Sequence, residues 1–252
     1  MKHKKKKDVR WEYIFGVNPI QEAINAGRRK ISGIIVKKGA TGKPVLSLIS
    51  HAKRCNIPVD FSSIDKIARL ADAEGHQGIV ALVTMPRLTD FDKLVERAIS
   101  KPKSGRPTLC LLDGVMDPRN LGAIIRSANA FGLDGVIYPA KRAASYTPVA
   151  AKASAGAGEH MSLCPVNNIA ECVRKLRDDG FHCVALDAGG TEELDFAGIS
   201  ALALVLGSEG KGIRPLVIKR CDKVMKIPIT GPVGSLNVSS AAAVTFHMAS
   251  SR

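Results

Sequence analysis

Short apolar segments alternate with segments of helical periodicity along almost the whole chain of 252 residues. Short apolar runs bounded by Gly or Pro are typical of strands, and apolar residues spaced by three and four are typical of helices. We expect strands at the following residues: 31–38, 58–62, 78–85, 108–115, 135–138, 163–166, 181–186, 202–206 and 223–229. We expect helices at the following residues: 18–26, 44–55, 63–73, 90–100, 121–131, 168–179 and 236–250, with one more opening at Thr147. This alternation predicts an α/β fold with a mostly parallel sheet covered on both faces.

One stretch interrupts the alternation and divides the chain. Residues 101–107 read Lys-Pro-Lys-Ser-Gly-Arg-Pro, which is a composition typical of a hinge. We therefore expect a basic disordered arm over 1–10, a small α/β domain over 11–86, a linker over 87–107 and a second α/β domain over 108–252. Each of the two domains is long enough to bury a core of its own.

The chain is strongly basic, with a net charge of +14. Residues 1–10 hold six Lys or Arg and one Asp, so most of this charge belongs to the rest of the chain. A basic folded body favours a polyanionic partner, with nucleic acid first and an anionic membrane surface second, although a merely soluble basic surface has the same composition. The run Lys4–Lys7 is expected to be a solvated arm that adds nonspecific affinity for phosphate. Aromatic residues make up only 4% of the chain, which argues against recognition by many base-stacking side chains.

The sequence argues against several other classes of protein. Its longest uninterrupted apolar run, 201–206, is far too short to cross a bilayer, and no secretory signal follows the basic start. The six cysteines form no Cys-x-x-Cys pair, and no spacing of His or carboxylate residues suggests a metal site. We therefore expect a cytoplasmic protein with free thiols, no bound metal and no membrane contact.

Three loops stand out because each leaves the end of an apolar strand: 113–122, 207–212 and 229–237. In parallel sheets, ligands bind beyond the carboxyl ends of the strands, so these loops are expected to form the functional site. The familiar nucleotide motifs do not fit. The segment 207–212 reads G-x-x-G-x-G rather than the dinucleotide pattern G-x-G-x-x-G, and it is too short for a P-loop. No G-x-S-x-G element suggests a hydrolase.

The residues of these loops resemble a known family. Residues 112–126, from Leu-Asp-Gly-Val to Ala-Ile-Ile-Arg, resemble motif one of the SpoU/TrmH-type RNA ribose 2′-O-methyltransferases of the SPOUT superfamily. Residues 204–212 resemble motif two, and residues 227–239 resemble motif three, in the family's order. The resemblance covers roughly 108–250 and is specific because the three motifs occur together.

The first part of the chain carries a second resemblance. Residues 14–85 resemble the small substrate-binding domain that precedes the catalytic domain in the rRNA-modifying branch. Two short segments carry this similarity, Phe-Gly-Val at 15–17 and His-Gln-Gly at 76–78.

The resemblance implies a fold, a cofactor and partners. It implies a catalytic domain with a C-terminal trefoil knot, S-adenosylmethionine as the cofactor, RNA as the substrate and a homodimer. The Asp-Pro-x-Asn form of motif one and the small N-terminal domain are more similar to the rRNA guanosine branch, so a guanosine in large-subunit rRNA is the expected substrate. One alternative is a tRNA 2′-O-methyltransferase. The alternative from another class is a noncatalytic RNA-binding or ribosome-assembly protein of the same fold.

The resemblance also assigns roles to single residues. It implies a catalytic role for the following five residues: Asn120, Arg126, Glu209, Ser235 and Asn237. It implies a cofactor-binding role for Gly207, Ile227 and Leu236, where glycine permits close approach of the backbone. Arg126 is expected near the reacting hydroxyl. Because a guanidinium is essentially never deprotonated in proteins, we expect it to hold the adjacent phosphate rather than to act as a base.

Each of these residues also has a purely structural interpretation. A helix cap would account for Asn120, Ser235 and Asn237. Core packing would account for Ile227 and Leu236, and a solvated surface for Arg126 and Glu209. Lys211 and Arg214 either contact RNA phosphate or face solvent. The segment 147–159, rich in Ala and Gly, is expected to form a closely packed helix, for which the dimer interface is one expected place, with Gly158 in place of a larger apolar residue.

Overall fold

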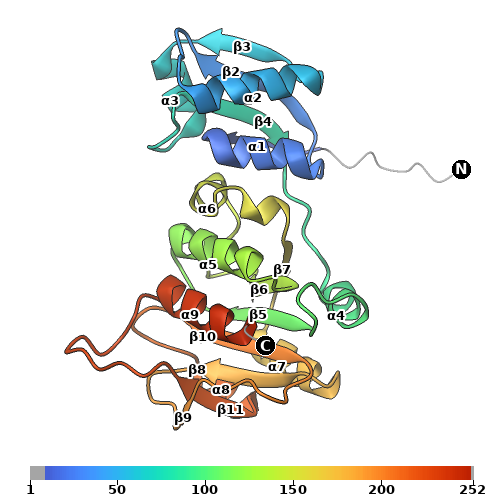
Figure 1. Ribbon diagram of the computed structural model, residues 1–252, viewed down its shortest axis with the longest axis vertical. Helices are drawn as coiled ribbons and strands as arrows, with labels where there is room; N and C mark the ends of the chain where they lie inside the picture. The colour runs from blue at the N-terminus through green and yellow to red at the C-terminus, as the bar shows by residue number, and fades with distance from the viewer. Residues whose placement is uncertain (1–8, 251–252) are drawn as a thin grey trace, which may run out of the picture. The chain divides into compact units, whose positions relative to one another are not determined.

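The computed structural model describes residues 9–250 of the chain. These residues form two compact units, with the boundary between Arg87 and Leu88 (Figure 1). The expected basic arm falls mainly on residues 1–8, which lie outside the described residues.

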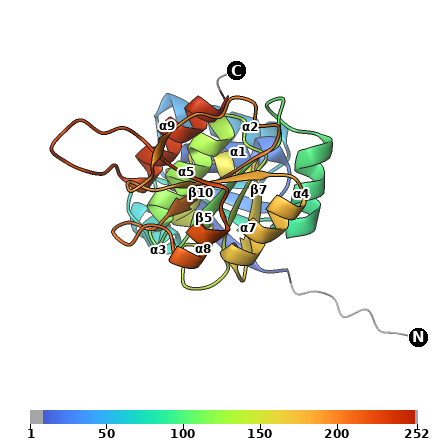
Figure 2. The same ribbon diagram turned by 90° about the horizontal axis from the view of Figure 1, so that it is seen from below.

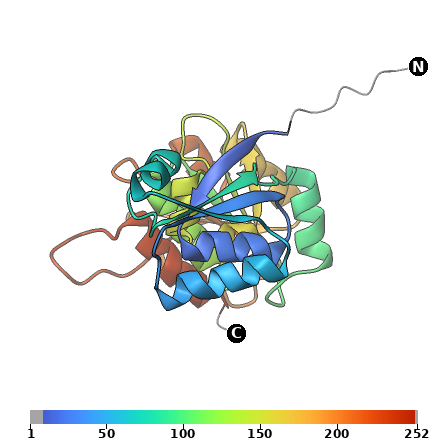
Figure 3. The same ribbon diagram turned by 90° about the horizontal axis from the view of Figure 1, so that it is seen from above.

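The first unit is built on a mixed four-stranded sheet. Its elements are β1 (Trp11–Phe15), α1 (Val17–Ala26), β2 (Ile31–Lys37), α2 (Lys43–Arg54), β3 (Val59–Ser62), α3 (Ile64–Ala71) and β4 (Ile79–Thr84). The strand order is β1-β4-β2-β3, in which β4 runs antiparallel to both of its neighbours and β2 runs parallel to β3. Helices α1 and α2 cover one face of the sheet, and α3 lies on the other (Figure 3).

Strand β1 is not predicted by the sequence. Only its last two residues, Ile14 and Phe15, are buried, so it lacks the continuous apolar run of β4. It pairs along β4, from Trp11 opposite Thr84 to Phe15 opposite Val80, and forms one edge of the sheet. An antiparallel edge strand with a solvated side carries a weaker sequence signal than a strand buried on both faces.

The two segments that carry the family resemblance in this unit meet at the start of α1. The helix expected at 18–26 begins one residue earlier, at Val17, and Gly16 stands at the capping position without a side-chain cap. Instead, the side-chain oxygen of Gln77 accepts a hydrogen bond from the backbone N–H of Val17 at 3.1 Å. The His-Gln-Gly segment therefore supplies the acceptor that the start of the helix needs.

The second unit is built on a seven-stranded sheet in which every pairing is parallel. Its elements are α4 (Phe91–Ser100), β5 (Thr108–Asp113), α5 (Pro118–Ala130), β6 (Gly135–Pro139), α6 (Pro148–Ala153), η1 (Ala157–Glu159), β7 (Ser162–Val166), α7 (Ile169–Asp178), β8 (His182–Leu186), β9 (Glu192–Glu193), β10 (Leu202–Gly207), α8 (Pro215–Arg220), β11 (Lys223–Lys226) and α9 (Val238–Ser250). The strand order is β7-β6-β5-β10-β8-β11-β9. The predicted α/β fold is confirmed.

Alternate residues of the central strands pack on opposite faces of this sheet. Leu112 and Leu204 lie in one core with α5, α6 and α9. Leu111 and Val205 lie in a second core with α4, α7 and α8. Figure 2 shows α5 and α9 on one side of the sheet and α4 and α7 on the other. The sheet is therefore covered on both faces, as expected for strands that are apolar at successive positions.

The stretch 87–107, expected as a linker, belongs to the second unit from Leu88 onward. The physical reason is the apolar face of α4, which buries Leu94, Val95 and Ala98 against the sheet. The chain after α4 is also held, because the Arg106 guanidinium donates hydrogen bonds to three backbone carbonyls of this unit. The hinge-like composition thus marks a connection that hydrogen bonds hold in place.

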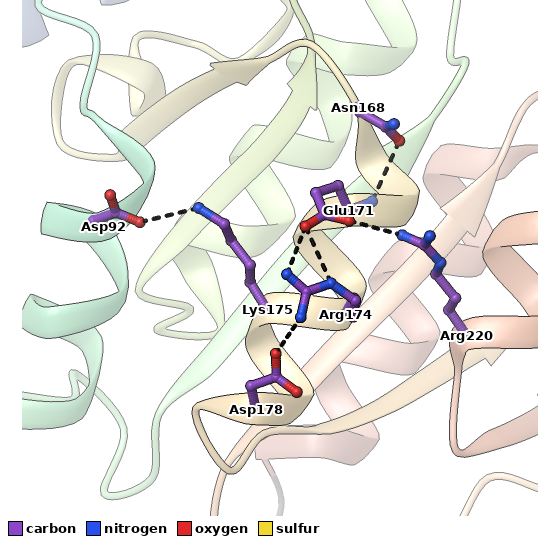
Figure 4. A network of polar contacts seen from close by, with 7 residues as sticks. All are labelled: Asp92, Asn168, Glu171, Arg174, Lys175, Asp178 and Arg220. Carbon is purple, nitrogen blue, oxygen red and sulfur yellow. Dashed lines mark hydrogen bonds and ion pairs between the residues drawn. The ribbon is translucent and has the colours of Figure 1, made fainter.

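A network of charged side chains ties α7 to its neighbours (Figure 4). Glu171 accepts a hydrogen bond from Arg174 of the same helix at 2.7 Å and one from Arg220, at the end of α8, at 3.1 Å. Lys175 lies 3.8 Å from Asp92 of α4. Because these side chains are largely exposed, the network contributes little to the free energy of unfolding. Its contacts link α7 to α4 and to α8.

Asp134 connects the start of β6 to the chain that leads into β5. Its carboxylate accepts hydrogen bonds from the backbone N–H groups of Lys103 and Thr108, both at 2.8 Å. Burial raises the pKa of Asp134, and the two backbone donors oppose that rise. Asp134→Ala should therefore lower the free energy of unfolding by about 1–3 kcal/mol, because it leaves the buried backbone N–H of Thr108 without an acceptor and removes the one that Lys103 uses. Thermal melting measures the effect. The exposed Asp60→Ala is the control, and an equal melting temperature for both variants would contradict this role.

The Ala/Gly-rich segment around α6 packs closely, as its composition predicts. A Cβ atom on Gly122 of α5 would lie 2.5 Å from the carbonyl oxygen of Ala150 in α6. Gly158 replaces a larger apolar residue because the ring of Tyr146 fills the space, only 2.3 Å from where a Cβ atom would lie. The buried Tyr146 thus supplies the apolar volume that position 158 lacks.

The end of the chain departs most from the expected elements. β11 ends at Lys226, and α9 begins at Val238, so residues 227–237 form a long loop that extends away from the sheet (Figure 1). The short α8 and β9 are not predicted by the sequence, because six and two residues are too few for a periodic pattern. The strand order shows which strands are neighbours, but it does not show whether one segment of the chain passes through a loop formed by another. The trefoil knot therefore stays a prediction.

Two further properties bear on the class of protein. Among residues 9–250, no helix has both the length and the apolar character needed to cross a membrane. The same residues hold no group of three His, Cys, Asp or Glu side chains that is placed to bind a metal ion.

Candidate active site

A cavity of about 630 Å³ lies at the edge of the second sheet where the parallel strands end. Its wall is formed by the residues after β8 and β10 and by both ends of the long loop before α9: 186–188, 206–212, Ile227, Ile229, 235–238 and Ala241. All three residues expected to bind the cofactor, Gly207, Ile227 and Leu236, line this one cavity.

A larger cavity, of about 830 Å³, lies at the opposite edge, where β8 and β11 begin. Several of its charged side chains are paired with one another: Arg177 lies 2.8 Å from Asp222, and Lys223 lies 2.6 Å from Glu192. Within the described part of the chain, no predicted site residue lines this cavity. The cavity at the carboxyl edge is therefore the candidate site.

Gly207 permits a tight turn directly after β10. A Cβ atom at Gly207 would lie 2.2 Å from the backbone carbon of Gly212. Ser208 and Gly212 exchange two backbone hydrogen bonds of 3.0 Å, which close the loop against Gly207. Glycine is therefore required at position 207 because the protein's own backbone, at Gly212, lies too close for a side chain. The result is a closed loop that forms this part of the cavity wall.

The two apolar residues of the predicted cofactor set differ in their surroundings. Ile227 is half-buried and packs against the core that contains α5 and α9, so core packing and a place in the cavity wall are both realised. Leu236 is 44% exposed, so core packing does not account for it.

Hydrogen bonds join one residue from each of the three predicted motifs. The side-chain amide of Asn120 donates to Oε1 of Glu209. The amide of Asn237 donates to Oδ1 of Asn120 at 3.3 Å. Oδ1 of Asn237 accepts from the backbone N–H and the hydroxyl of Ser239, at 2.8 and 2.6 Å. Side chains far apart in the sequence thus form one continuous chain of hydrogen bonds, and Glu209 and Asn237 line the cavity.

The helix caps decide between the two interpretations of the asparagines. Asp117, rather than Asn120, caps α5, because its carboxylate accepts from the backbone N–H of Arg119 at 2.7 Å. The helix begins at Pro118, so Asn120 lies inside its first turn, and its amide reaches Glu209 instead. The cap interpretation of Asn120 is wrong. Asn237 caps the first turn of α9 and also bonds Asn120, so the cap interpretation is confirmed and its role in the reaction stays a prediction.

Arg126 and Ser235 are not joined to this network. Arg126 lies exposed on α5, six residues after Asn120, and six residues turn a helix by about 240°, so the two side chains leave the helix on different sides. Across the described residues, its guanidinium has no hydrogen-bond or ion-pair partner. Ser235 is exposed and lines the cavity.

An ion pair that the sequence does not single out holds the far end of the loop 208–212. Asp113 ends β5 with a side chain that is 0% exposed. It accepts three hydrogen bonds from Arg214: from Nε at 2.8 Å, Nη2 at 2.6 Å and the backbone N–H at 2.8 Å. These hydrogen bonds raise the pKa of the Arg214 guanidinium. Because Gly207 also pairs with Asp113 in the sheet, both ends of the loop are anchored on one residue. The available signal was a charged residue at the end of an apolar strand.

Arg214 remains 63% exposed while it is paired, and Lys211 is exposed. Both side chains are therefore accessible to a phosphate group of RNA. Arg214→Ala leaves the buried Asp113 carboxylate with only the backbone N–H as donor, and it should lower the free energy of unfolding by about 1–3 kcal/mol. Arg214→Lys should recover only part of this loss, because an ammonium lacks the two-donor fork. Thermal melting measures both variants, and full recovery by lysine would contradict the role of the fork.

Two families match the chain and together cover most of its length. The SpoU rRNA Methylase family matches residues 107–247, and the family of RNA 2′-O ribose methyltransferase substrate-binding domains matches residues 13–89. A relative from Staphylococcus aureus strain MSSA476 carries the name TrmH family tRNA/rRNA methyltransferase. It is 38% identical over 93% of this chain and 93% of its own length.

Solved structures have the same fold. The SpoU methyltransferase AviRb from Streptomyces viridochromogenes is similar with a TM-score of 0.75 at 25% identity, over 95% of this chain and 88% of AviRb. The structure of AviRb in complex with AdoMet is similar with a TM-score of 0.74 at 24% identity, over 94% of this chain and 88% of AviRb.

Together with the fold, these matches define an RNA 2′-O-methyltransferase that has a substrate-binding domain before its catalytic domain. The chain belongs to the SpoU/TrmH family.

Proposed function

We propose that this protein transfers a methyl group from S-adenosylmethionine to the ribose 2′-hydroxyl of a guanosine in large-subunit rRNA. The observation that supports this most strongly is the chain of hydrogen bonds through Asn120, Glu209 and Asn237 at the cavity. A protein that only binds RNA does not require this arrangement of polar side chains. The noncatalytic alternative is therefore the less favoured one.

The residues of the cavity fit the cofactor. Its volume suits a molecule of this size, and its wall combines a closed glycine loop with Ile227 and Leu236. Gly207, Ile227 and Leu236 would hold S-adenosylmethionine, mainly through backbone and apolar contacts. When bound, this cofactor supplies an electrophilic methyl group on a positively charged sulfur.

The polar residues at the cavity then have tasks that their positions allow. Oε2 of Glu209 has no hydrogen-bond partner among the described residues, so it is available to accept a hydrogen bond from the ribose 2′-hydroxyl and to orient it. Asn120 and Asn237 hold Glu209 in place. Arg126 lies outside the network, so its proposed role rests on the family resemblance: it would hold the adjacent phosphate as a charged donor, and that phosphate would assist departure of the hydroxyl proton. Ser235 is a further donor in the cavity wall.

The two units divide the work. We place RNA binding on residues 11–86 and on the basic surface, and methyl transfer on residues 108–252. The small N-terminal domain and the Asp-Pro-x-Asn segment of motif one favour rRNA. The name of the S. aureus relative includes both tRNA and rRNA, so tRNA is the second candidate substrate. The proposal includes a homodimer of knotted catalytic domains in the cytoplasm, where the six free cysteines stay reduced.

Incubation with methyl-labelled S-adenosylmethionine and unmodified total RNA tests the proposal. The expected result is label in large-subunit rRNA at one alkali-resistant position, and much less label with Arg126→Ala. Label in tRNA alone would contradict the substrate and keep the chemistry. Absence of label, although the cofactor binds, would favour the noncatalytic alternative.

Residues 1–8 contain five lysines and should contribute nonspecific phosphate contacts. Deleting them should weaken RNA binding and reduce the slope of log K against log salt by about 0.7–0.9 for each phosphate contact that is lost. Cofactor affinity should not change. Filter binding at several salt concentrations measures the slope, and an unchanged slope would contradict a role for the arm.

A further inference from the structure

Asp187 is a charged residue of the cavity wall that none of the three motifs contains. It directly follows β8 and is half-buried. Its backbone N–H donates to the carbonyl of Met225 in β11 at 3.0 Å, which fixes the residue between two strands. It lines the same cavity as Gly207 and Glu209.

The two carboxylate oxygens of Asp187 have different surroundings. Oδ1 accepts from the backbone N–H of Gly189 at 2.9 Å and so caps the turn that follows β8. Oδ2 has no hydrogen-bond or ion-pair partner within residues 9–250. It faces the glycine loop, because a Cβ atom on Gly212 would lie 3.1 Å from it. One oxygen is thus used by the fold, and the other is available at the cavity.

The charged side chains of this wall do not balance. Asp187 and Glu209 are carboxylates, and Lys211 is the one ammonium among the described lining residues. Glu209 is engaged by Asn120, and Lys211 is exposed. The wall therefore carries an excess of negative charge, and Asp187 is the carboxylate to which no side chain donates a hydrogen bond.

We infer that Asp187 is a further cofactor-binding residue, which selects S-adenosylmethionine over its demethylated product. This inference rests on the proposed function. Methyl transfer breaks the bond between sulfur and the methyl carbon, and the sulfur keeps the electron pair and loses its positive charge. Substrate and product therefore differ by one positive charge and one methyl group. A carboxylate in the cavity wall lowers the free energy of the charged form more than that of the neutral one, and so favours release of the product.

The competing explanation is that Asp187 only caps its turn. Asp187→Asn separates the two, because the asparagine oxygen can still accept from Gly189 while the charge is removed. Asp195 provides a matched control. It caps the same kind of turn, with Oδ1 accepting from the backbone N–H of Ala197 at 2.9 Å, and it lies outside this cavity.

Isothermal titration of the full-length protein with S-adenosylmethionine and with S-adenosylhomocysteine tests the inference. Asp187→Asn should weaken binding of S-adenosylmethionine by about fivefold or more and change binding of S-adenosylhomocysteine by less than about twofold. Asp195→Asn should change neither affinity. An equal loss for both ligands in Asp187→Asn, or no loss for either, would overturn the inference.

A second measurement needs no variant. In the wild-type protein, raising the salt concentration should weaken binding of S-adenosylmethionine more than binding of S-adenosylhomocysteine, because screening acts on the extra charge. An identical salt dependence for both ligands would also overturn the inference.

If the wild-type protein binds neither ligand, the proposed cofactor itself is wrong. If it binds both and the variant keeps their affinity ratio, only the role of Asp187 is wrong.

Discussion

Asn120→Ala should lower the rate constant of methyl transfer by about 100-fold, which is typical for the loss of one positioned hydrogen-bonding group in an active site. Asn120 is the only described residue that bonds both Glu209 and Asn237, so its removal breaks the chain at its centre. Glu209 would then lose the donor that fixes its orientation. Because Asn120 does not line the cavity, cofactor affinity should change by less than about twofold.

Single-turnover kinetics with labelled cofactor and saturating RNA measure this effect apart from product release. Asn168→Ala is the matched control, since Asn168 also lies at the start of a helix and accepts from the backbone N–H of Glu171 at 3.3 Å, away from the cavity. The control should keep its rate constant for methyl transfer. Equal rate constants for Asn120→Ala and the wild-type protein would contradict a role for this network in the reaction.

Gly207→Ala should weaken cofactor binding by at least about tenfold and lower the free energy of unfolding by about 1–3 kcal/mol, as overpacking typically does. The added methyl group would collide with the backbone of Gly212 and Ile213, at 2.2 and 2.4 Å. Both colliding stretches of backbone are held in place. Gly207 is held by the pairing of β10 with β5, and the backbone after Gly212 is held by the hydrogen bonds of Arg214 to Asp113. The loop must therefore shift, and the cavity wall shifts with it.

Isothermal titration with S-adenosylmethionine and thermal melting measure the two effects of Gly207→Ala. Gly231→Ala serves as the control because a Cβ atom at Gly231 meets no atom within 4 Å. It should keep the melting temperature and the cofactor affinity of the wild-type protein. A Gly207→Ala protein that melts and binds like the control would show that the loop does not need its observed geometry.

The fold was predictable from the sequence wherever elements bury apolar residues periodically. Strands β5 and β10 are buried along almost their whole length, and α7 buries one face, so their patterns are strong. Strand β1 escapes prediction because its partner β4 supplies the order that its own residues do not indicate. Helix α4 was predicted, but its place in the second unit was not, because the hinge-like composition follows it and only its packing on the sheet assigns it to that unit.

The candidate site was predictable only in part, for a similar reason. Motif resemblance selects Asn120, Glu209 and Asn237. The hydrogen bonds between them depend on the order of the strands in the sheet, because Asn120 lies 89 positions from Glu209 and 117 positions from Asn237 in the sequence. The sequence also predicts that glycine is needed at position 207 for a close approach, but it does not show that the backbone of Gly212 makes this approach. Asp113 and Asp187 lie at strand ends outside the residues with an expected role, so only the structure reveals their contacts.

The most direct test of the central claim is the chemical identity of the methylated nucleoside. RNA methylated by the purified protein should be digested to nucleosides and analysed by mass spectrometry, with Glu209→Gln as the control with impaired transfer. We predict a new 2′-O-methylguanosine, with the methyl group on the ribose fragment, that decreases strongly in the control. A methyl group on the base fragment would contradict ribose methylation, and equal amounts of product from both proteins would contradict the role of Glu209.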